Sequence, residues 1–80
     1  MTDFFTPRIK NLKSLLTRKN LSTLLILKDE NIYYLTGFYG ANSASMLLVI
    51  KDVLYLIISP IYAEQAKKSI ENSDINIVCY

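Results

Sequence analysis

Apolar residues recur at intervals of three and four near the start of the chain, with charged residues between them. This spacing predicts an amphipathic helix, whose apolar stripe consists of Ile9, Leu12, Leu15 and Leu16. Thr6 is a good N-cap, and Pro7 follows at the first helical position, where its missing N–H costs nothing. Lys19–Asn20 should end the helix, because a cation suits the helix C-terminus and Asn tolerates a left-handed conformation.

Continuous apolar runs follow, and they predict strands rather than further amphipathic helices. The first, "STLLILK", fits a strand covered on both faces, as in a parallel or mixed sheet packed by helices. The runs "SMLLVI" and "VLYLIIS" are separated by Lys51–Asp52, which indicates a hairpin. A turn without Gly or Asn is a weak hairpin signal, so we expect a loop slightly longer than two residues. The last run, "INIVCY", predicts a final strand.

Two shorter helices are expected between the strands. Asp29 should cap a short helix that ends at Gly37, because glycine takes a positive φ without strain. Ser59–Pro60 should open a second helix, "PIYAEQAKKSIEN", whose buried stripe consists of Tyr62, Ala66 and Ile70. The whole order predicts an α/β fold: a mixed sheet of about four strands with a central hairpin and helices on its faces. The final strand–helix–strand unit should be parallel.

The composition suggests that this sheet belongs to a larger structure. The chain has 80 residues, of which 51% are hydrophobic, more than a small free-standing domain can easily bury. Two full helices barely cover an apolar four-stranded sheet, and the chain ends on a strand that would expose an edge. We therefore expect residues 1–80 to be a truncated domain whose sheet continues in a parent polypeptide.

Charge and hydropathy exclude several classes of partner. The net charge of +2 is too small to predict nucleic-acid binding, and the basic residues near the start read as a solvated helix face. No signal peptide is visible, and the apolar region from 46 to 61 is too short and interrupted to span a bilayer. Cys79 is the single cysteine, so no disulfide framework exists and a small buried side chain is expected. We predict a soluble, cytoplasmic protein.

Catalytic chemistry is nearly absent from the sequence. The chain has no His, so a Cys–His pair cannot form, and it carries no phosphate-binding loop or CxxC motif. A dinuclear metal site needs several converging carboxylates around ions about 3.5–4 Å apart. The seven acids are scattered, and Asp29 and Glu30 are explained by a helix start. We expect no catalytic residue, no metal and no cofactor in this chain.

The stretch "NIYYLTGFYG", from Asn31 to Gly40, contains four aromatic rings and two glycines. If Gly37 terminates the helix, Phe38 should pack back on Tyr33 one turn earlier. That leaves Tyr39 and the following small residues unexplained. Rigid aromatics on a loop beside small residues suit contact with a peptide or a neighbouring subunit, so Tyr39 and Asn42 are candidate contact residues.

Two segments in this order resemble the N-terminal domain of the creatinase/prolidase family, which includes Xaa-Pro dipeptidases and aminopeptidases P. They are "ENIYYLTGFYGANSASMLLV" and "YLIISPIYAEQAKKSIE". The most specific parts are the stretch from Asn31 to Gly40 and the Tyr-x-Glu-Gln-Ala run that begins at Tyr62. The resemblance extends over essentially the whole chain from Arg8 onward.

The resemblance implies a domain that is not itself the catalyst. In the family, a following pita-bread domain, absent here, binds two divalent metals (Mn or Co for the parent) and cleaves the bond before proline in short peptides. The N-terminal domain helps to form a homodimer and shields the active-site mouth. Residue by residue, Gly37, Phe38, Gly40, Asn42 and Tyr62 match the family's pattern. With Tyr39 from the loop argument above, we expect turn roles for Gly37 and Gly40, and substrate or partner contacts for Phe38, Tyr39, Asn42 and Tyr62.

The sequence departs from the family at one notable place. Where the family commonly has Asp and Arg before the matching Tyr62, this chain has Ser59 and Ile61, so no ion pair is available there. Two alternatives stay open: the N-terminal domain of a creatinase-type amidinohydrolase, and a stand-alone interaction module.

Overall fold

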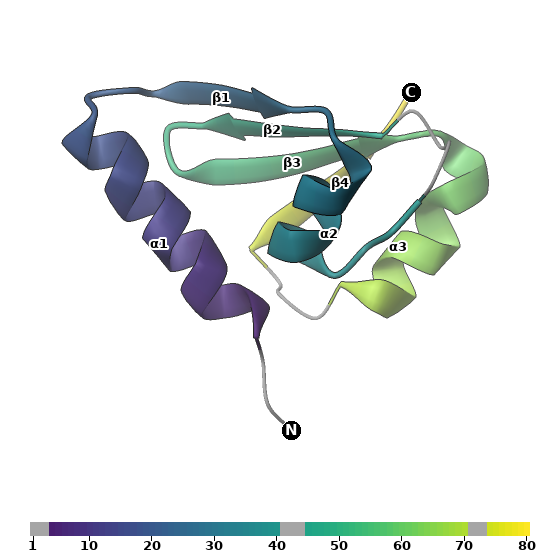
Figure 1. Cartoon of the computed structure of the whole chain (residues 1–80). Coiled ribbons are helices and arrows are strands. Elements are labelled where there is room, and N and C mark those ends of the chain that lie inside the picture. The colour runs from purple at the N-terminus through teal and green to yellow at the C-terminus, as the bar shows by residue number, and fades with distance from the viewer. Residues whose placement is uncertain (1–3, 41–44, 71–73) are drawn as a thin grey trace.

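The computed structural model of the chain describes residues 4–40, 45–70 and 74–80. Its elements follow the order predicted from the sequence (Figure 1). They are α1 (Phe5–Arg18), β1 (Thr23–Ile26), α2 (Asp29–Thr36), β2 (Met46–Ile50), β3 (Val53–Ile58), the 3₁₀ turn η1 (Pro60–Tyr62), α3 (Ala63–Ser69) and β4 (Ile75–Cys79). Asn20, just beyond α1, has a φ of 59°, which confirms the left-handed position expected after that helix.

The four strands form one mixed sheet in the order β1-β2-β3-β4. Strand β2 pairs antiparallel with β1 and with β3, and β4 runs parallel to β3, as the strand–helix–strand unit predicts. The hairpin β2–β3 therefore forms the centre, and β1 and β4 form the edges.

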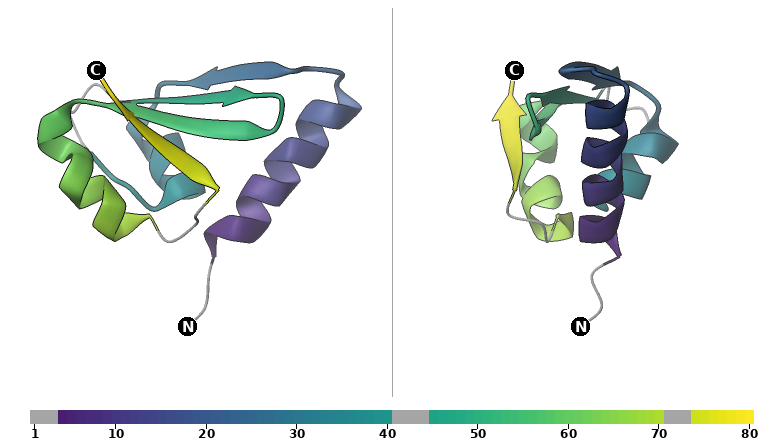
Figure 2. Two further views of the ribbon diagram at one scale, coloured as in Figure 1. Left: turned by 180° about the vertical axis from the view of Figure 1, so that it is seen from behind. Right: turned by 90° about the vertical axis from the view of Figure 1, so that its left-hand side faces the viewer.

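All three helices lie on one face of the sheet (Figures 1 and 2). The side chains of β2 and β3 that face the helices are completely buried, and this inner face holds Leu47, Val49, Leu54, Leu56 and Ile58. Ile9 and Leu16 of α1, Ile32 and Leu35 of α2, Phe38 and Ala66 complete the core from the helix side. The fold is thus a two-layer structure with its core between helices and sheet.

The opposite face of the sheet is apolar and carries no helix among the described residues. The strand registers place alternate residues there, including Thr23 and Asn76 on the two edge strands. We define the outer face by its apolar residues: Leu25, Met46, Leu48, Ile50, Val53, Tyr55, Ile57 and Val78. Leu25 is 51% exposed and Val78 is 41% exposed. The prediction that "STLLILK" is covered on both faces is therefore wrong for the described part of the chain, because β1 is an edge strand covered on its inner side alone.

The hairpin turn is tighter than the sequence suggests. Ile50 pairs with Val53, so the loop consists of Lys51 and Asp52 alone and not of the longer loop expected. Their φ angles are 48° and 69°. Two successive left-handed residues are typical of a type I′ turn, whose twist matches that of the strands but normally selects Asn-Gly.

This turn offers a simple stabilising change. Replacing Lys51 by Asn and Asp52 by Gly should raise the free energy of unfolding by about 1 kcal/mol. Each left-handed L-residue costs roughly 1–2 kcal/mol, and part of the gain is offset because glycine has more conformational entropy in the unfolded chain. The midpoint of urea denaturation measures the effect. Lys51→Val, which places a β-branched residue at positive φ, should lower the midpoint; an unchanged midpoint in both variants would contradict this account of the turn.

Two of the three N-caps differ from the predicted ones, by two residues for α1 and by one for α2. Helix α1 begins at Phe5, with Phe4 in the N-cap position, so Thr6 lies inside the first turn. Lys28 rather than Asp29 precedes α2, although Asp29 and Glu30 do lie in the first turn as acids should. Ser59 does occupy the N-cap before Pro60, but the helix opens as a 3₁₀ turn, with the Tyr62 N–H donating to the Ser59 carbonyl at 3.0 Å.

Two expectations about single features can also be compared with the structure. Cys79 is exposed, so the prediction of a small buried side chain is wrong. Within the described ranges, no helix has the length and apolar character needed to cross a membrane.

Candidate functional site

The loop after α2 is fixed by a glycine. Gly37 has a φ of 85°, and its N–H donates to the carbonyl oxygen of Tyr33 at 2.8 Å. A Cβ added here would lie 3.2 Å from the Phe5 ring and 3.2 Å from the carbonyl oxygen of Ser69. Two features favour glycine at this turn: the positive φ and the close approach of Phe5 of α1 and Ser69 of α3.

Gly37→Ala should lower the free energy of unfolding by at least about 1–2 kcal/mol, the usual cost of a left-handed L-residue. The Ser69 carbonyl adds to this cost because it belongs to the backbone and cannot move aside easily. Urea denaturation measures the loss. Gly37→Asn is the matched variant: it carries the same Cβ but tolerates this φ, so it should lose less. Equal stability of Gly37→Ala and the unsubstituted chain would contradict both reasons.

The residues on either side of Gly37 are buried. Thr36 is 1% exposed; its hydroxyl donates to the Ile32 carbonyl at 2.7 Å and accepts the N–H of Phe38 at 3.1 Å. Phe38 is 0% exposed. The side chain of Phe38 therefore belongs to the core, and its proposed role as a substrate or partner contact is not supported.

The ring that packs on Tyr33 is that of Tyr39, not that of Phe38 as the helix-termination pattern suggests. The centroids of Tyr33 and Tyr39 are 6.0 Å apart with the rings at 88°, an edge-to-face contact. Phe5 of α1 meets the other side of Tyr33, with centroids 6.2 Å apart and the rings at 76°. Three rings from α1, α2 and the loop thus form a row.

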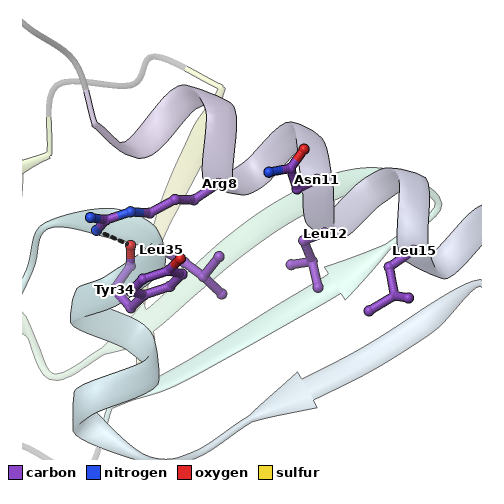
Figure 3. Close-up of a pocket in the computed structure, with 6 residues that line it drawn as sticks. All are labelled: Arg8, Asn11, Leu12, Leu15, Tyr34 and Leu35. Carbon is purple, nitrogen blue, oxygen red and sulfur yellow. Dashed lines mark hydrogen bonds between the residues drawn. The ribbon is translucent and has the colours of Figure 1, made fainter.

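Arg8 extends this row. Its guanidinium carbon lies 5.2 Å from the Phe5 ring centroid and 4.1 Å from that of Tyr34, both within range of a cation–π interaction. Its Nη1 also donates to the Tyr34 carbonyl oxygen at 2.9 Å (Figure 3). We define the aromatic ladder as Tyr34, Arg8, Phe5, Tyr33 and Tyr39, in order of contact.

An open groove of about 240 Å³ lies between α1 and α2, next to the ladder (Figure 3). Its lining is mainly apolar, with one cation at one end, and consists of Arg8, Asn11, Leu12, Leu15, Tyr34 and Leu35. Such a lining suits contact with apolar side chains and offers no acid–base pair for catalysis.

The predicted site residues are divided among several places. Tyr39 is 49% exposed and lies in the ladder, whereas Tyr62 lies in η1, half-buried against the core. Gly40 is buried, and Asn42 lies outside the described residues.

The sequence reasoning missed Phe5 and Arg8. Their spacing of three on one helix, which brings side chains together, was the available signal.

The described part of the chain contains no group of three or more His, Cys, Asp or Glu side chains arranged to hold a metal ion. The described site consists of exposed tyrosines, one stacked guanidinium and an apolar groove.

The family model described as the creatinase/prolidase N-terminal domain matches residues 8–79. The fold is similar to an Xaa-Pro aminopeptidase from Streptococcus pyogenes, with a TM-score of 0.86 and 31% identity over 100% of this chain and 59% of that one. It is also similar to the N-terminal domain of the cytoplasmic peptidase PepQ from Mycobacterium tuberculosis, with a TM-score of 0.78 and 29% identity over 92% of this chain and 55% of that one.

An Xaa-Pro dipeptidase from Bacillus anthracis is similar in fold, with a TM-score of 0.77 and 24% identity; the match covers 92% of this chain but 20% of that enzyme. The chain thus spans less than three fifths of each of these solved chains. A comparison with curated protein sequences found no match.

Proposed function

The chain belongs to the creatinase/prolidase N-terminal domain family, and from this premise we propose that it is the non-catalytic N-terminal part of a proline-specific metallopeptidase. The match over residues 8–79 carries the proposal, since it extends over nearly the whole chain. The similarity to an Xaa-Pro aminopeptidase at 31% identity supports a parent that hydrolyses the bond before proline in short peptides. Function is nevertheless a property of sites rather than folds, so the parent's reaction has to be tested directly.

In this proposal the chemistry belongs to a C-terminal catalytic domain that binds two divalent metals, Mn or Co. The described residues of the present chain hold no metal-ligand cluster, and the proposed partners are that domain, a second subunit and the short proline-containing peptides of the parent. A cytoplasmic location is part of the proposal and is supported by the similarity to a peptidase described as cytoplasmic.

The roles that we assign to the chain are dimerisation and shielding of the active-site mouth. Two features support them. The loop from Thr36 to Gly40 holds Tyr39 half exposed, two residues after the left-handed Gly37, and exposed tyrosines are typical of contact surfaces. The apolar outer face supports a position beneath further polypeptide, as expected if residues 1–80 are part of a longer domain.

The experiment that tests the parent's function begins with the reading frame beyond Tyr80. A downstream stretch with spaced Asp, Asp, His, Glu and Glu ligands supports the peptidase. A related domain without the acids supports a creatinase-type amidinohydrolase, and a stop codon supports a stand-alone module. The full-length protein is then assayed with Mn²⁺ on Xaa-Pro dipeptides and on matched Xaa-Ala dipeptides; equal cleavage of both, or of neither, would contradict the proposal.

A further inference from the structure

The aromatic ladder is larger than its structural role requires. Packing α1 onto α2 uses the Phe5 ring, which is half-buried, and the Arg8 guanidinium between Phe5 and Tyr34. The other rings remain available, since Tyr33 is 47% exposed, Tyr34 55% and Tyr39 49%. Tyr and Arg are the residues that most often dominate binding energy at protein surfaces. Three half-exposed tyrosines joined by edge contacts and one guanidinium therefore need an explanation beyond helix packing.

We propose that the aromatic ladder is a binding surface for extended, proline-containing peptide segments. The choice of ligand rests on the proposed function, in which the parent acts on such peptides. The surface itself rests on the contacts of the described residues alone.

The chemistry of the two surfaces is complementary. Proline has no N–H, so a proline-containing segment presents carbonyl acceptors and flat apolar rings, and in the polyproline II conformation it makes no internal hydrogen bonds. The ladder presents ring surfaces together with phenolic O–H groups and guanidinium N–H groups, which are donors. Aromatic-lined surfaces of this kind recognise proline-rich segments in several domain types.

The dimensions also agree. The contacts from Phe5 to Tyr33 and from Tyr33 to Tyr39 are 6.2 and 6.0 Å between centroids, so the three rings extend over at most about 12 Å. Polyproline II rises about 3.1 Å per residue, and the row therefore corresponds to about four residues of an extended peptide. Because the rings are already held by one another and by Arg8, little side-chain entropy is lost on binding.

The test uses the 80-residue chain and two peptides, Ac-Gly-Pro-Pro-Pro-Pro-Gly-NH₂ and the same peptide with alanine at all four proline positions. Titration followed by ¹H–¹⁵N NMR should shift the amide signals of residues 5, 8, 33, 34 and 39 and give weak, saturable binding. The alanine peptide should bind at least about fivefold more weakly, because its chain is not preorganised.

Variants locate the site. Tyr33→Ser and Tyr39→Ser should each weaken binding of the proline peptide about fivefold or more, as loss of a hot-spot ring does. Tyr80→Ser removes a tyrosine that is 61% exposed at the end of β4, outside the ladder, and should leave binding unchanged. The dispersion of the NMR spectrum shows that each variant is folded.

Three results would overturn the proposal: no shifts at millimolar peptide, equal binding of the alanine peptide, or shifts confined to the outer face of the sheet. If Tyr39→Ser changes the oligomeric state while the peptide does not bind, the ladder is a contact between subunits and the proposal is wrong. A parent that cleaves Xaa-Pro dipeptides while this chain binds no proline peptide contradicts this inference alone. Binding without such cleavage contradicts the proposed function alone.

Discussion

Phe38→Ala should leave the isolated chain largely unfolded at 25 °C. Phe38 is 0% exposed, in the core beneath the turn at Gly37. Truncating a buried Phe to Ala costs about 3–5 kcal/mol, and a single core of this size rarely supplies more than about 3–5 kcal/mol in total. Circular dichroism of the variant should show little native helix signal, and the cooperative urea transition should be lost.

The neighbouring Tyr39 provides the matched control. It is 49% exposed and contacts Tyr33 by an edge, so Tyr39→Ala should lower the free energy of unfolding by about 1 kcal/mol, the value of one aromatic pair. Similar losses for the two variants would contradict the assignment of Phe38 to the core and Tyr39 to the surface. The same comparison separates a buried aromatic from an exposed aromatic in adjacent positions.

The stretch from Asn31 to Gly40 illustrates what sequence reasoning can reach. The stop at Gly37 follows from a local rule, since a positive φ at the end of a helix selects glycine, and the structure confirms it. Which of Phe38 and Tyr39 faces the core depends on the direction in which the chain leaves the turn. That direction is set by the hydrogen bond from the Phe38 N–H to the Thr36 hydroxyl. The pattern of apolar residues along the chain does not predict this hydrogen bond.

The aromatic ladder could be predicted from the sequence only in part. Tyr39 was predicted to be a contact residue because its exposure on a loop could be inferred, and the structure shows it 49% exposed. Phe5 was not predicted to take part, because α1 was expected to begin after it. Arg8 was not predicted to take part, because basic residues usually lie on a solvated helix face. Here the helix starts one residue before the expected cap, and this brings Phe5 against Tyr33. Tertiary packing overrode a capping preference worth about 1 kcal/mol.

The sheet was predicted in its strand number, order of elements, central hairpin and parallel last strand, because these depend on apolar runs and on connection rules. The number of sheet faces that helices cover was not predicted correctly. A continuous apolar run is the same sequence signal whether the second face is packed or open, so β1 could not be recognised as an edge strand with Leu25 half exposed.

The open outer face has a consequence for the chain in solution: we expect it to self-associate. Four strands spaced about 4.8 Å apart, each with about five residues at about 3.3 Å, give a flat area of about 300 Å². Two copies stacked face to face would bury about 600 Å², well below the roughly 1,200 Å² of a specific interface. Association should therefore be weak and rise with concentration, which sedimentation velocity between about 10 and 500 μM measures.

Leu48→Lys combined with Tyr55→Glu should make the chain monomeric throughout that range. These residues are cross-strand partners at the centre of the outer face, so the two substitutions place opposite charges side by side, which is compatible with strand pairing. The control adds the same two charges elsewhere, as Leu15→Lys with Ile61→Glu; Leu15 is 38% exposed on α1 and Ile61 is 81% exposed in η1. The control should associate as the unsubstituted chain does.

The same pair of substitutions distinguishes a face used between subunits from a face covered by the rest of the parent. A segment of the same polypeptide covers 300 Å² without the loss of translational freedom that association costs, so an area too small for a stable dimer is sufficient within one chain. In the full-length parent, Leu48→Lys with Tyr55→Glu should then lower the free energy of unfolding, because two charges would be buried. A parent that keeps its stability would mean that the rest of the polypeptide does not cover the outer face. An isolated chain that stays monomeric at every concentration would mean that the face is not used between subunits.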